Sequence, residues 1–257
     1  MATQIDKARQ FAALHVKGDP VILFNIWDAG GAKALAEAGA TVVATGSWAV
    51  AVAHGYADGE QLPLELAIAN LKRIVASVEL PVTFDMESGY GRSPETVRET
   101  TAQAVAAGAI GVNFEDQIIG ETGLYPVEEQ AARIRAVRQA ADDADVPLYI
   151  NARTDVFLKL KPADHTDAHL EEVVQRAQAF ADAGASGLFA PALADERRIA
   201  ALCERSPLPV NLLVTAHTPP LKRMAELGVA RISFGSGSYR TVMAAFTSAA
   251  RAAFEMK

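Results

Sequence analysis

Eight short apolar runs alternate with longer segments of helical periodicity along this chain, and this alternation limits the fold more than any other feature. The runs are rich in Val, Ile, Leu and Phe without a clean apolar–polar alternation, which is typical of strands buried on both faces. The predicted strands are Val21–Ile26, Ala40–Thr45, Pro81–Asp85, Ala109–Glu115, Val146–Ala152, Ala185–Ala190, Pro209–Val214 and Val229–Phe234.

A helix is predicted after each strand, with boundary residues that favour helix starts and ends. Ser93 and Pro94 are typical of a cap followed by the first helical position, and Gly108 and Gly184 stand between a helix and the next strand. An additional helix at Gln4–Val16 is expected to close the floor of the fold. The predicted helices span 30–38, 62–77, 94–107, 127–141, 168–183, 194–205, 218–227 and 237–256.

Eight strand–helix units joined by short connections predict an α/β fold, a single (β/α)₈ TIM-type barrel with an extra N-terminal helix. The length of 257 residues suits one such barrel, and we expect residues 1–257 to form one domain. A doubly wound open sheet is the structural alternative. Half of the residues are hydrophobic, which is enough for a large core.

Charge and composition exclude several classes of partner and site. The formal net charge is −7 and no basic run is present, so we expect no nucleic-acid partner. Cys203 is the only cysteine, which excludes an intrachain disulfide and a cysteine-based zinc site. No signal-like N-terminus or apolar run of roughly 18 residues occurs, so no membrane association is expected and a cytoplasmic location is predicted.

Polar residues gather where the predicted strands end, which is the active-site face of such barrels. Acidic residues come from three neighbouring strand ends or loops: Asp58, Asp85 with Glu87, and Glu115 with Asp116. These carboxylates would repel one another unless a hard cation neutralised them, and oxygen-only ligation suits Mg²⁺, with Mn²⁺ as the alternative. A single such acid would more commonly cap the next helix, but several together favour a metal site.

Other residues at the same face are candidates for binding a carboxylate substrate. Arg153 is expected to hold a carboxylate or stabilise an oxyanion, or else to form a buried ion pair with Asp155 or Glu115. The segment Thr45-Gly46-Ser47 offers backbone N–H groups to an anion. Trp27 and Asn211 complete the predicted substrate-binding set, although packing is the commoner fate of a tryptophan.

An ordered set of motifs resembles the isocitrate lyase and phosphoenolpyruvate mutase superfamily, along nearly the whole chain. No single motif decides the resemblance, but their order does. The matching stretches are Asn25–Ala29, Ala44–Ser47, Gly55–Glu60, Asp85–Gly91, Gly111–Asp116, Asn151–Asp155, Phe189–Pro191 and Arg231–Gly235.

The resemblance implies a role for each matching residue. Asp85 corresponds to the direct Mg²⁺ ligand, while Glu87, Glu115 and Asp58 correspond to the acids that hold its waters. Arg153 corresponds to the arginine that binds the substrate and stabilises an enolate. The resemblance also implies that the amides of Gly46 and Ser47 bind a carboxylate or phosphonate, and that the protein is a homotetramer or homodimer, with its last helix exchanged between subunits.

The loop after the fourth predicted strand departs from the family pattern. The lyases of this family carry Lys, Cys, Gly and His there, with the Cys as the catalytic acid/base, and the mutases carry a Lys and an Asn. Here the loop Gln117–Tyr125 contains no Cys, His, Lys, Arg or Asn. The resemblance therefore identifies the superfamily and leaves the reaction open.

The predicted function is that of a Mg²⁺-dependent enzyme acting on a small 2-oxo acid or related carboxylate through an enolate. Arg153, Glu115 and Asp58 are the predicted catalytic residues. A C–C lyase, decarboxylase or hydrolase acting on an oxaloacetate-like substrate is favoured, because those reactions do not need the missing Cys. The alternatives are P–C chemistry on phosphonopyruvate and a protein that binds a 2-oxo acid without turnover.

Overall fold

The computed structural model describes residues 2–255, and its strands form one eight-stranded sheet in which every pair of neighbouring strands is parallel. The strand order is β1-β8-β7-β6-β5-β4-β3-β2. Each strand therefore lies beside its neighbour in sequence, as a barrel requires. The strands are β1 (Val21–Leu23), β2 (Val43–Ala44), β3 (Val82–Asp85), β4 (Gly111–Glu115), β5 (Tyr149–Arg153), β6 (Gly187–Phe189), β7 (Val210–Leu213) and β8 (Arg231–Ser233).

The sheet closes between β1 and β2 through a single parallel bridge, Ile26 with Thr45. The Ile26 N–H donates to the Ala44 carbonyl at 2.9 Å, and the Gly46 N–H donates to the Ile26 carbonyl at 3.1 Å. The strand pairing thus returns to its starting strand, which confirms the TIM-type barrel and excludes the open doubly wound sheet.

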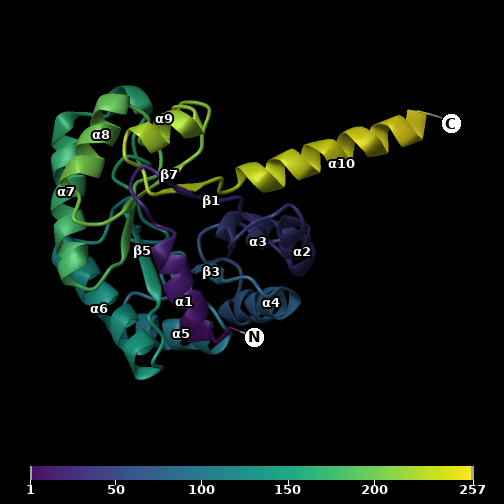
Figure 1. The fold of residues 1–257 in the computed structure, drawn as a ribbon, viewed down its shortest axis with the longest axis horizontal. Coiled ribbons are helices and arrows are strands. Elements are labelled where there is room, and N and C mark those ends of the chain that lie inside the picture. Colours follow the sequence, from purple (N-terminus) through teal and green to yellow (C-terminus); the bar gives the residue numbers. More distant parts are fainter. Residues whose placement is uncertain (1, 256–257) are drawn as a thin grey trace.

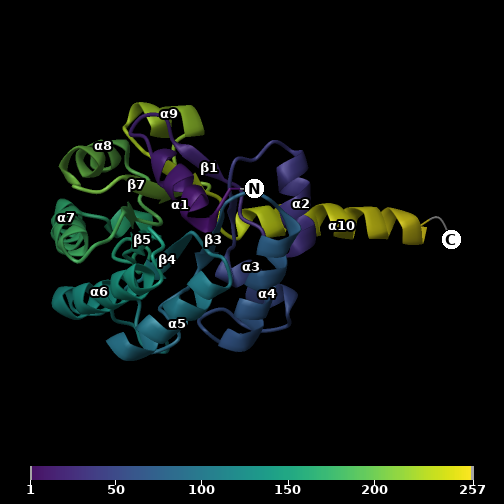
Figure 2. The same cartoon turned by 60° about the horizontal axis from the view of Figure 1, so that its bottom comes forward.

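Helices surround the strands in a ring, as seen when the molecule is viewed toward the end of the barrel (Figure 2). No helix among residues 2–255 is long and apolar enough to cross a membrane. The elements are α1 (Gln4–Ala13), α2 (Ala29–Glu37), α3 (Ser47–Ala53), α4 (Leu64–Ser77), α5 (Pro94–Ala106), α6 (Val127–Asp143), the 3₁₀ helix η1 (Pro162–Asp164), α7 (Asp167–Asp182), α8 (Glu196–Arg205), α9 (Leu221–Glu226) and α10 (Gly237–Glu255).

The extra N-terminal helix α1 is present and packs across the end of the barrel opposite to the polar strand ends. A capping box formed by Thr3 and Asp6 starts it. Its Phe11 is fully buried against Tyr149 of β5, with ring centroids 5.2 Å apart. The Gln4 amide donates to the carbonyls of Val105 and Ala109, each at 2.9 Å. These contacts confirm the predicted floor.

The structure corrects several predicted element bounds. Most strands are shorter than the apolar runs, because in a tilted barrel the ends of a run extend past the neighbouring strand. Ser47–Ala53, expected as loop, is helix α3, and it starts at Gly46 without a side-chain cap. The predicted helix 218–227 shortens to α9, and residue 256 of the last predicted helix lies outside the described residues.

The last helix, α10, leaves the barrel and projects away from it (Figures 1 and 2). Only Ser238 among its described residues is buried. Two aromatic contacts hold its first turn: Tyr239 meets Trp27 edge-on at 4.8 Å, and the Arg240 guanidinium lies 4.4 Å from the Trp48 ring centre. The helix that follows β8, α10, therefore does not cover the outer face of its own barrel.

Candidate active site

A cavity of about 220 Å³ lies at the carboxyl ends of the strands. Residues from all eight strand ends or following loops contribute to it, so its shape depends on the barrel as a whole. Acidic, hydroxyl and apolar groups share the lining: Asn25, Gly46, Ser47, Trp48, Asp58, Asp85, Asn113, Arg153, Leu158, Phe189, Pro191, Leu213, Ser233, Gly235 and Ser236.

Asn25 fastens three strand ends around the mouth of this cavity. Its Oδ1 accepts hydrogen bonds from the backbone N–H groups of Phe234 and Gly235, at 3.0 and 2.8 Å. Its Nδ2 donates to the Thr45 carbonyl at 2.9 Å. One buried amide thus joins the ends of β1, β2 and β8 where the barrel has its fewest strand hydrogen bonds.

Asp85 ends β3 and faces the cavity. Its Oδ2 accepts from the Ser47 backbone N–H at 2.9 Å, and its own N–H donates to Thr45 Oγ1 at 2.9 Å. The first turn of α3 and the end of β2 therefore hold the Asp85 carboxylate in place. Such support from neighbouring groups is what a metal-binding carboxylate requires.

Three non-glycine residues with positive φ form a hydrogen-bonded group behind Asp85: Glu60 (57°), Glu87 (50°) and Tyr90 (57°). The Glu60 N–H donates to Glu87 Oε2 at 2.7 Å, and the Tyr90 N–H donates to Glu60 Oε1 at 2.8 Å. Backbone strain of this kind persists only where surrounding contacts fix it, and it concentrates at functional sites. Here it places the Glu87 carboxylate against the α3–α4 loop, which contains Glu60.

Gly89 allows the segment from Glu87 to Tyr90, which follows β3, to pack closely against its neighbours. Its φ is +91°, and a Cβ there would lie 2.9 Å from both a Phe114 ring carbon and a Val97 methyl. Any larger residue would push the segment from Glu87 to Tyr90 outward.

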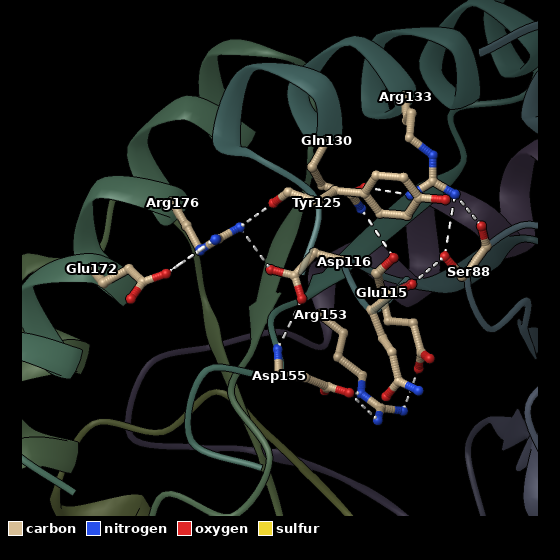
Figure 3. Close-up of polar contacts among 11 residues, drawn as sticks. Ser88, Glu115, Asp116, Tyr125, Gln130, Arg133, Arg153, Asp155, Glu172 and Arg176 are labelled. Carbon is tan, nitrogen blue, oxygen red and sulfur yellow. Dashed lines mark hydrogen bonds and ion pairs between the residues drawn. The ribbon is translucent and has the colours of Figure 1, made fainter. Parts of the chain in front are cut away.

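Arg153, at the end of β5, lies between two buried carboxylates (Figure 3). Its Nη1 is 2.6 Å from Glu115 Oε2, and its Nε and Nη2 donate to both oxygens of Asp155, at 2.6 and 2.8 Å. Burial favours a lower pKa for Arg153, but Glu115 and Asp155 outweigh it and raise the pKa. The guanidinium is therefore cationic, fixed, and still exposed over 18% of its side chain.

Two further buried arginines, on α6 and α7, support this group from behind (Figure 3). Arg176 Nη1 donates to Asp116 Oδ2 at 3.1 Å, and Asp116 Oδ1 accepts from the Asp155 N–H at 3.0 Å. Arg133 lies 3.8 Å from the Tyr125 ring centre and donates to the Ser88 carbonyl. Both arginines thus anchor the strand-end loops to the helical ring.

Burial and neighbouring negative charges raise the pKa values of three acids at or behind the cavity. Burial, then the charge of Asp85, raises the pKa of Asp58. Burial raises the pKa of Glu87 to about 8, with Asp85, Asp58 and Glu60 adding to the rise. Burial also raises the pKa of Glu115, while Arg153 opposes that rise. This set of oxygen donors carries excess negative charge, and a hard divalent cation suits such a set.

The chain matches the family model for phosphoenolpyruvate phosphomutase over residues 11–254. The chain belongs to this family. It is 48% identical to the crystal structure of a candidate phosphonomutase from Burkholderia cenocepacia, with a TM-score of 0.96, covering 98% of this chain and 100% of the other. It is 28% identical to an oxaloacetate decarboxylase of Pseudomonas putida, over 93% of this chain and 81% of that protein. It is also 28% identical to a 2-methylisocitrate lyase of Bacillus subtilis, over 85% and 71%.

These relatives place the chain in the isocitrate lyase and phosphoenolpyruvate mutase superfamily, as the motifs predicted, among enzymes that act on small carboxylates. The structure gathers five of the predicted site residues at the cavity: Gly46, Ser47, Asp58, Asp85 and Arg153. Thr45 and Glu87 lie behind Asp85, in a small hollow with Tyr90.

Other predicted residues lie elsewhere. Trp27 packs against Tyr239 of α10, and Asn211 is fully buried inside the barrel, so neither lines the cavity. Glu115 does not line the cavity, but its Oε2 lies 2.6 Å from Nη1 of Arg153, which does. Among residues 2–255, no three His, Cys, Asp or Glu side chains converge as metal ligands. The metal-binding roles of Asp85, Glu87 and Glu115 stay predictions.

The predicted anion cradle is already engaged in internal hydrogen bonds. The Gly46 N–H donates to the Ile26 carbonyl and the Ser47 N–H donates to Asp85. The Ser47 side chain still lines the cavity.

Sequence reasoning left out Asn113, Ser233 and Ser236 as site residues, although all three line the cavity. Position at a strand end was the available signal for Asn113 and Ser233, since they lie near the ends of β4 and β8. It also missed an apolar wall formed by Leu158, Phe189, Pro191 and Leu213. That wall draws on the ends of β6 and β7 and on the loops after β5 and β6, so no local pattern marks it.

Proposed function

We propose that this protein is a Mg²⁺-dependent enzyme that acts on a small 2-oxo acid through an enolate. We favour C–C cleavage, decarboxylation or hydrolysis of an oxaloacetate-like substrate. One observation carries this proposal: Arg153, fixed by Glu115 and Asp155, shares a 220 Å³ cavity with the supported carboxylate of Asp85. A fixed cation facing a metal-binding acid is the arrangement that stabilises a developing oxyanion.

The residues present fit Mg²⁺. Asp85 would hold the ion directly, with Glu87, Glu115 and Asp58 reaching it through waters, since Mg²⁺ takes one or two carboxylates and keeps several waters. When bound, Mg²⁺ would supply Lewis acidity toward the keto and carboxylate oxygens of the substrate. Mn²⁺ would serve the same donor set.

The protein's own groups would perform the remaining tasks. Arg153 would bind the substrate carboxylate and stabilise the oxyanion charge as a bond to C3 breaks, and Glu115 would keep the guanidinium aimed. Asp58 would hold water at the cavity. Leu158, Phe189, Pro191 and Leu213 would exclude water from the C3 substituent, which favours loss of a carboxylate as CO₂. The similarity to an oxaloacetate decarboxylase supports this reading.

P–C chemistry on phosphonopyruvate is the second candidate. The match to the phosphoenolpyruvate phosphomutase family model favours it, and so does the similarity to the 48% identical candidate phosphonomutase. A protein that binds 2-oxo acids without turnover is the candidate from another class, because fold alone does not establish catalysis. Assays with Mg²⁺ on oxaloacetate, phosphonopyruvate and methylisocitrate separate the three. We expect oxaloacetate to be consumed fastest.

Calorimetry with oxalate, an enolate mimic, tests the metal site. Wild type is expected to bind oxalate with Mg²⁺ and not in EDTA, and Asp85→Ala to abolish that binding. Glu87→Ala and Glu115→Ala are expected to weaken it about 10–100-fold. Asp164→Ala, on the exposed η1 helix, is the control. Equal affinity in EDTA would exclude the metal assignment.

We also propose that α10 packs on a second copy of this chain in a homodimer or homotetramer. The helix exposes Val242, Phe246 and Phe254, at 45%, 67% and 73%. Their spacing of four or eight residues puts them on one face. On the barrel, β1 exposes Ile22 at 44% beside a groove of about 540 Å³, where a helix following β8 would pack in a closed barrel.

A further inference from the structure

A polar layer fills the barrel interior directly below the cavity, where branched apolar residues are usual. Asn113 of β4 is paired in register with Asp85 of β3 and with Asn151 of β5, so these three side chains project to the same side of the sheet. Arg231 enters the same interior from β8 and is 1% exposed. Of this layer, Asp85 and Asn113 line the cavity.

The Asn113 side-chain oxygen accepts two hydrogen bonds from this layer. Asn151 Nδ2 donates to Asn113 Oδ1 at 2.9 Å, and Arg231 Nη2 donates to the same oxygen at 2.9 Å. Arginine has donors only, so a reversed Asn113 amide would place an NH₂ group against another donor. Arg231 therefore fixes the orientation of the Asn113 amide, with Oδ1 toward Arg231 and Nδ2 away from it. Without such a neighbour, both orientations of an asparagine amide would be possible.

Arg231 is well suited to impose that orientation. It is cationic at neutral pH, because burial lowers its pKa only to about 10. No carboxylate within residues 2–255 forms an ion pair with it, and its Nε and Nη1 find no protein partner there. Among the described residues, the hydrogen bond to Asn113 Oδ1 is thus the one protein hydrogen bond of the Arg231 guanidinium, and losing it would leave a buried cation without a hydrogen-bond acceptor.

The Asn113 Nδ2 is left facing the cavity, and no side chain or carbonyl among the described residues accepts from it. Its neighbours there are Asp85 on one side and, two residues along β4, the Glu115–Arg153 pair. A rigid donor between a metal-binding acid and a cation selects an oxygen that can only accept.

We infer that Asn113 is a specificity-determining residue of this site: its Nδ2 donates to a carbonyl, enolate or carboxylate oxygen of the ligand. Arg231, which does not line the cavity, acts as the positioning residue. This inference rests on the proposed function, since it assumes that the cavity binds a 2-oxo acid or its enolate.

Reversing the donor tests the inference. In Asn113→Asp one oxygen keeps the bond to Arg231 and the other turns an acceptor toward the ligand. With Mg²⁺ present, we expect oxalate to bind about 10–100-fold more weakly, as for a lost hydrogen bond to a charged group. Oxamate, which replaces one oxalate oxygen by an NH₂ donor, is expected to lose much less, so the oxalate-to-oxamate affinity ratio falls at least about tenfold.

Further variants separate orientation from structure. Asn113→Ser is expected to weaken oxalate less than Asn113→Asp, because it removes the donor without adding a negative charge. Arg231→Met releases the amide and is expected to shrink the oxalate preference, while Arg231→Lys, which keeps a buried donor, restores part of it. Melting curves confirm that each variant folds.

The outcomes distinguish this inference from the proposed function. Wild type that binds no oxalate with Mg²⁺ overturns the proposed function, whatever Asn113 does. Suppose instead that wild type binds oxalate and that Asn113→Asp and Asn113→Ser bind it equally well, with an unchanged oxalate-to-oxamate affinity ratio. That result overturns the role of Asn113. A normal ratio in Arg231→Met overturns the positioning role of Arg231.

Discussion

The ion pairs that bury Arg153 also orient its guanidinium toward the cavity. Asp155 grips one edge of the guanidinium and Glu115 meets Nη1, yet part of the side chain still reaches the cavity. A buried pair is costly to break and adds little net stability, so its geometry is best explained by function. The sequence placed Arg153, Asp155 and Glu115 at adjacent strand ends, but their bonding depends on strand register.

Arg153→Lys keeps the charge and loses the planar fork, so we expect kcat and kcat/KM to fall together by about 10²–10³-fold. The melting temperature is expected to change little, because the lysine still neutralises the two acids. Arg205→Lys is the matched control, since Arg205 forms a bidentate ion pair with Glu171 on the exposed surface. Full activity in Arg153→Lys with a large fall in melting temperature would assign the arginine to structure alone.

His15 links stability to pH at the barrel floor. It stacks on Tyr149 with ring centres 3.8 Å apart, and Nδ1 meets the Phe11 carbonyl at 2.9 Å. Burial, then the charge of Arg231, lowers its pKa from 6.5 to about 3. Between those values the unfolded chain binds a proton that the folded chain does not. The contribution of His15 to the free energy of unfolding therefore falls as pH drops from about 6.5 to 3, by up to about 1.4 kcal/mol per pH unit.

Denaturant titrations from pH 8 to pH 4 on wild type and His15→Gln isolate this effect. The pKa of Asp116, raised to about 6 by burial, acts in the opposite direction between 3.8 and 6, but it is common to both proteins. The stability difference between wild type and His15→Gln should therefore shrink steadily with falling pH. His217→Gln, at an exposed position, should show no such trend. Parallel curves for wild type and His15→Gln would contradict a buried neutral His15.

At the scale of elements, the apolar runs predicted all eight strands because burial on both faces leaves a strong local pattern. The runs predicted strand ends poorly, since pairing in a barrel depends on the neighbouring strand. Helix α3 escaped prediction because Ser47–Ala53 alternates large and small apolar residues and lacks a capping side chain. The positive φ values at Glu60, Glu87 and Tyr90 have no local signal either, since contacts between distant loops impose them.

The loop Gln117–Tyr125 is the element that separates this chain from the lyases it resembles. An antiparallel bridge joins Gln117 to Leu124, and the Tyr125 N–H donates to the Asp116 carbonyl at 2.8 Å. Cleavage of isocitrate or methylisocitrate leaves a carbanion-like product that must be protonated on carbon, which needs a positioned acid. Thr122 is the only hydroxyl between Glu115 and Tyr125, and a hydroxyl is a poor acid near neutral pH.

We therefore expect little or no cleavage of either tricarboxylate with saturating Mg²⁺, despite the 28% identity to a 2-methylisocitrate lyase. Release of glyoxylate and pyruvate is measured with coupled dehydrogenases, and oxalate binding by the same preparation shows that the site is intact. Cleavage at rates typical of enzymes, about 1 s⁻¹ or more, would contradict the prediction and assign the proton donor to another residue.

At the scale of the whole molecule, α10 is the feature that one chain does not explain. Trp27 and Trp48 hold its base against the barrel, so the helix projects in a fixed direction. Exposed aromatic side chains along such a helix are unfavourable in water, and each would gain about 1.5–3 kcal/mol on full burial. In a two-fold symmetric pair, both copies of α10 would be covered at once.

We expect wild type to be a dimer or tetramer at micromolar concentration in analytical ultracentrifugation. Phe246→Glu should shift it toward monomer, because the change puts a charge into the proposed contact and removes the most exposed aromatic ring of the middle of α10. Ile22→Glu, in the groove beside β1, should act in the same way if that groove receives the partner's helix. Leu66→Glu is the matched control, because Leu66 is 39% exposed, lies on α4 and does not line the groove. A monomeric wild type would exclude the packing of α10 on a second copy of the chain. An assembly disrupted by Phe246→Glu but not by Ile22→Glu would keep α10 as the contact and move its receiving surface elsewhere on the barrel.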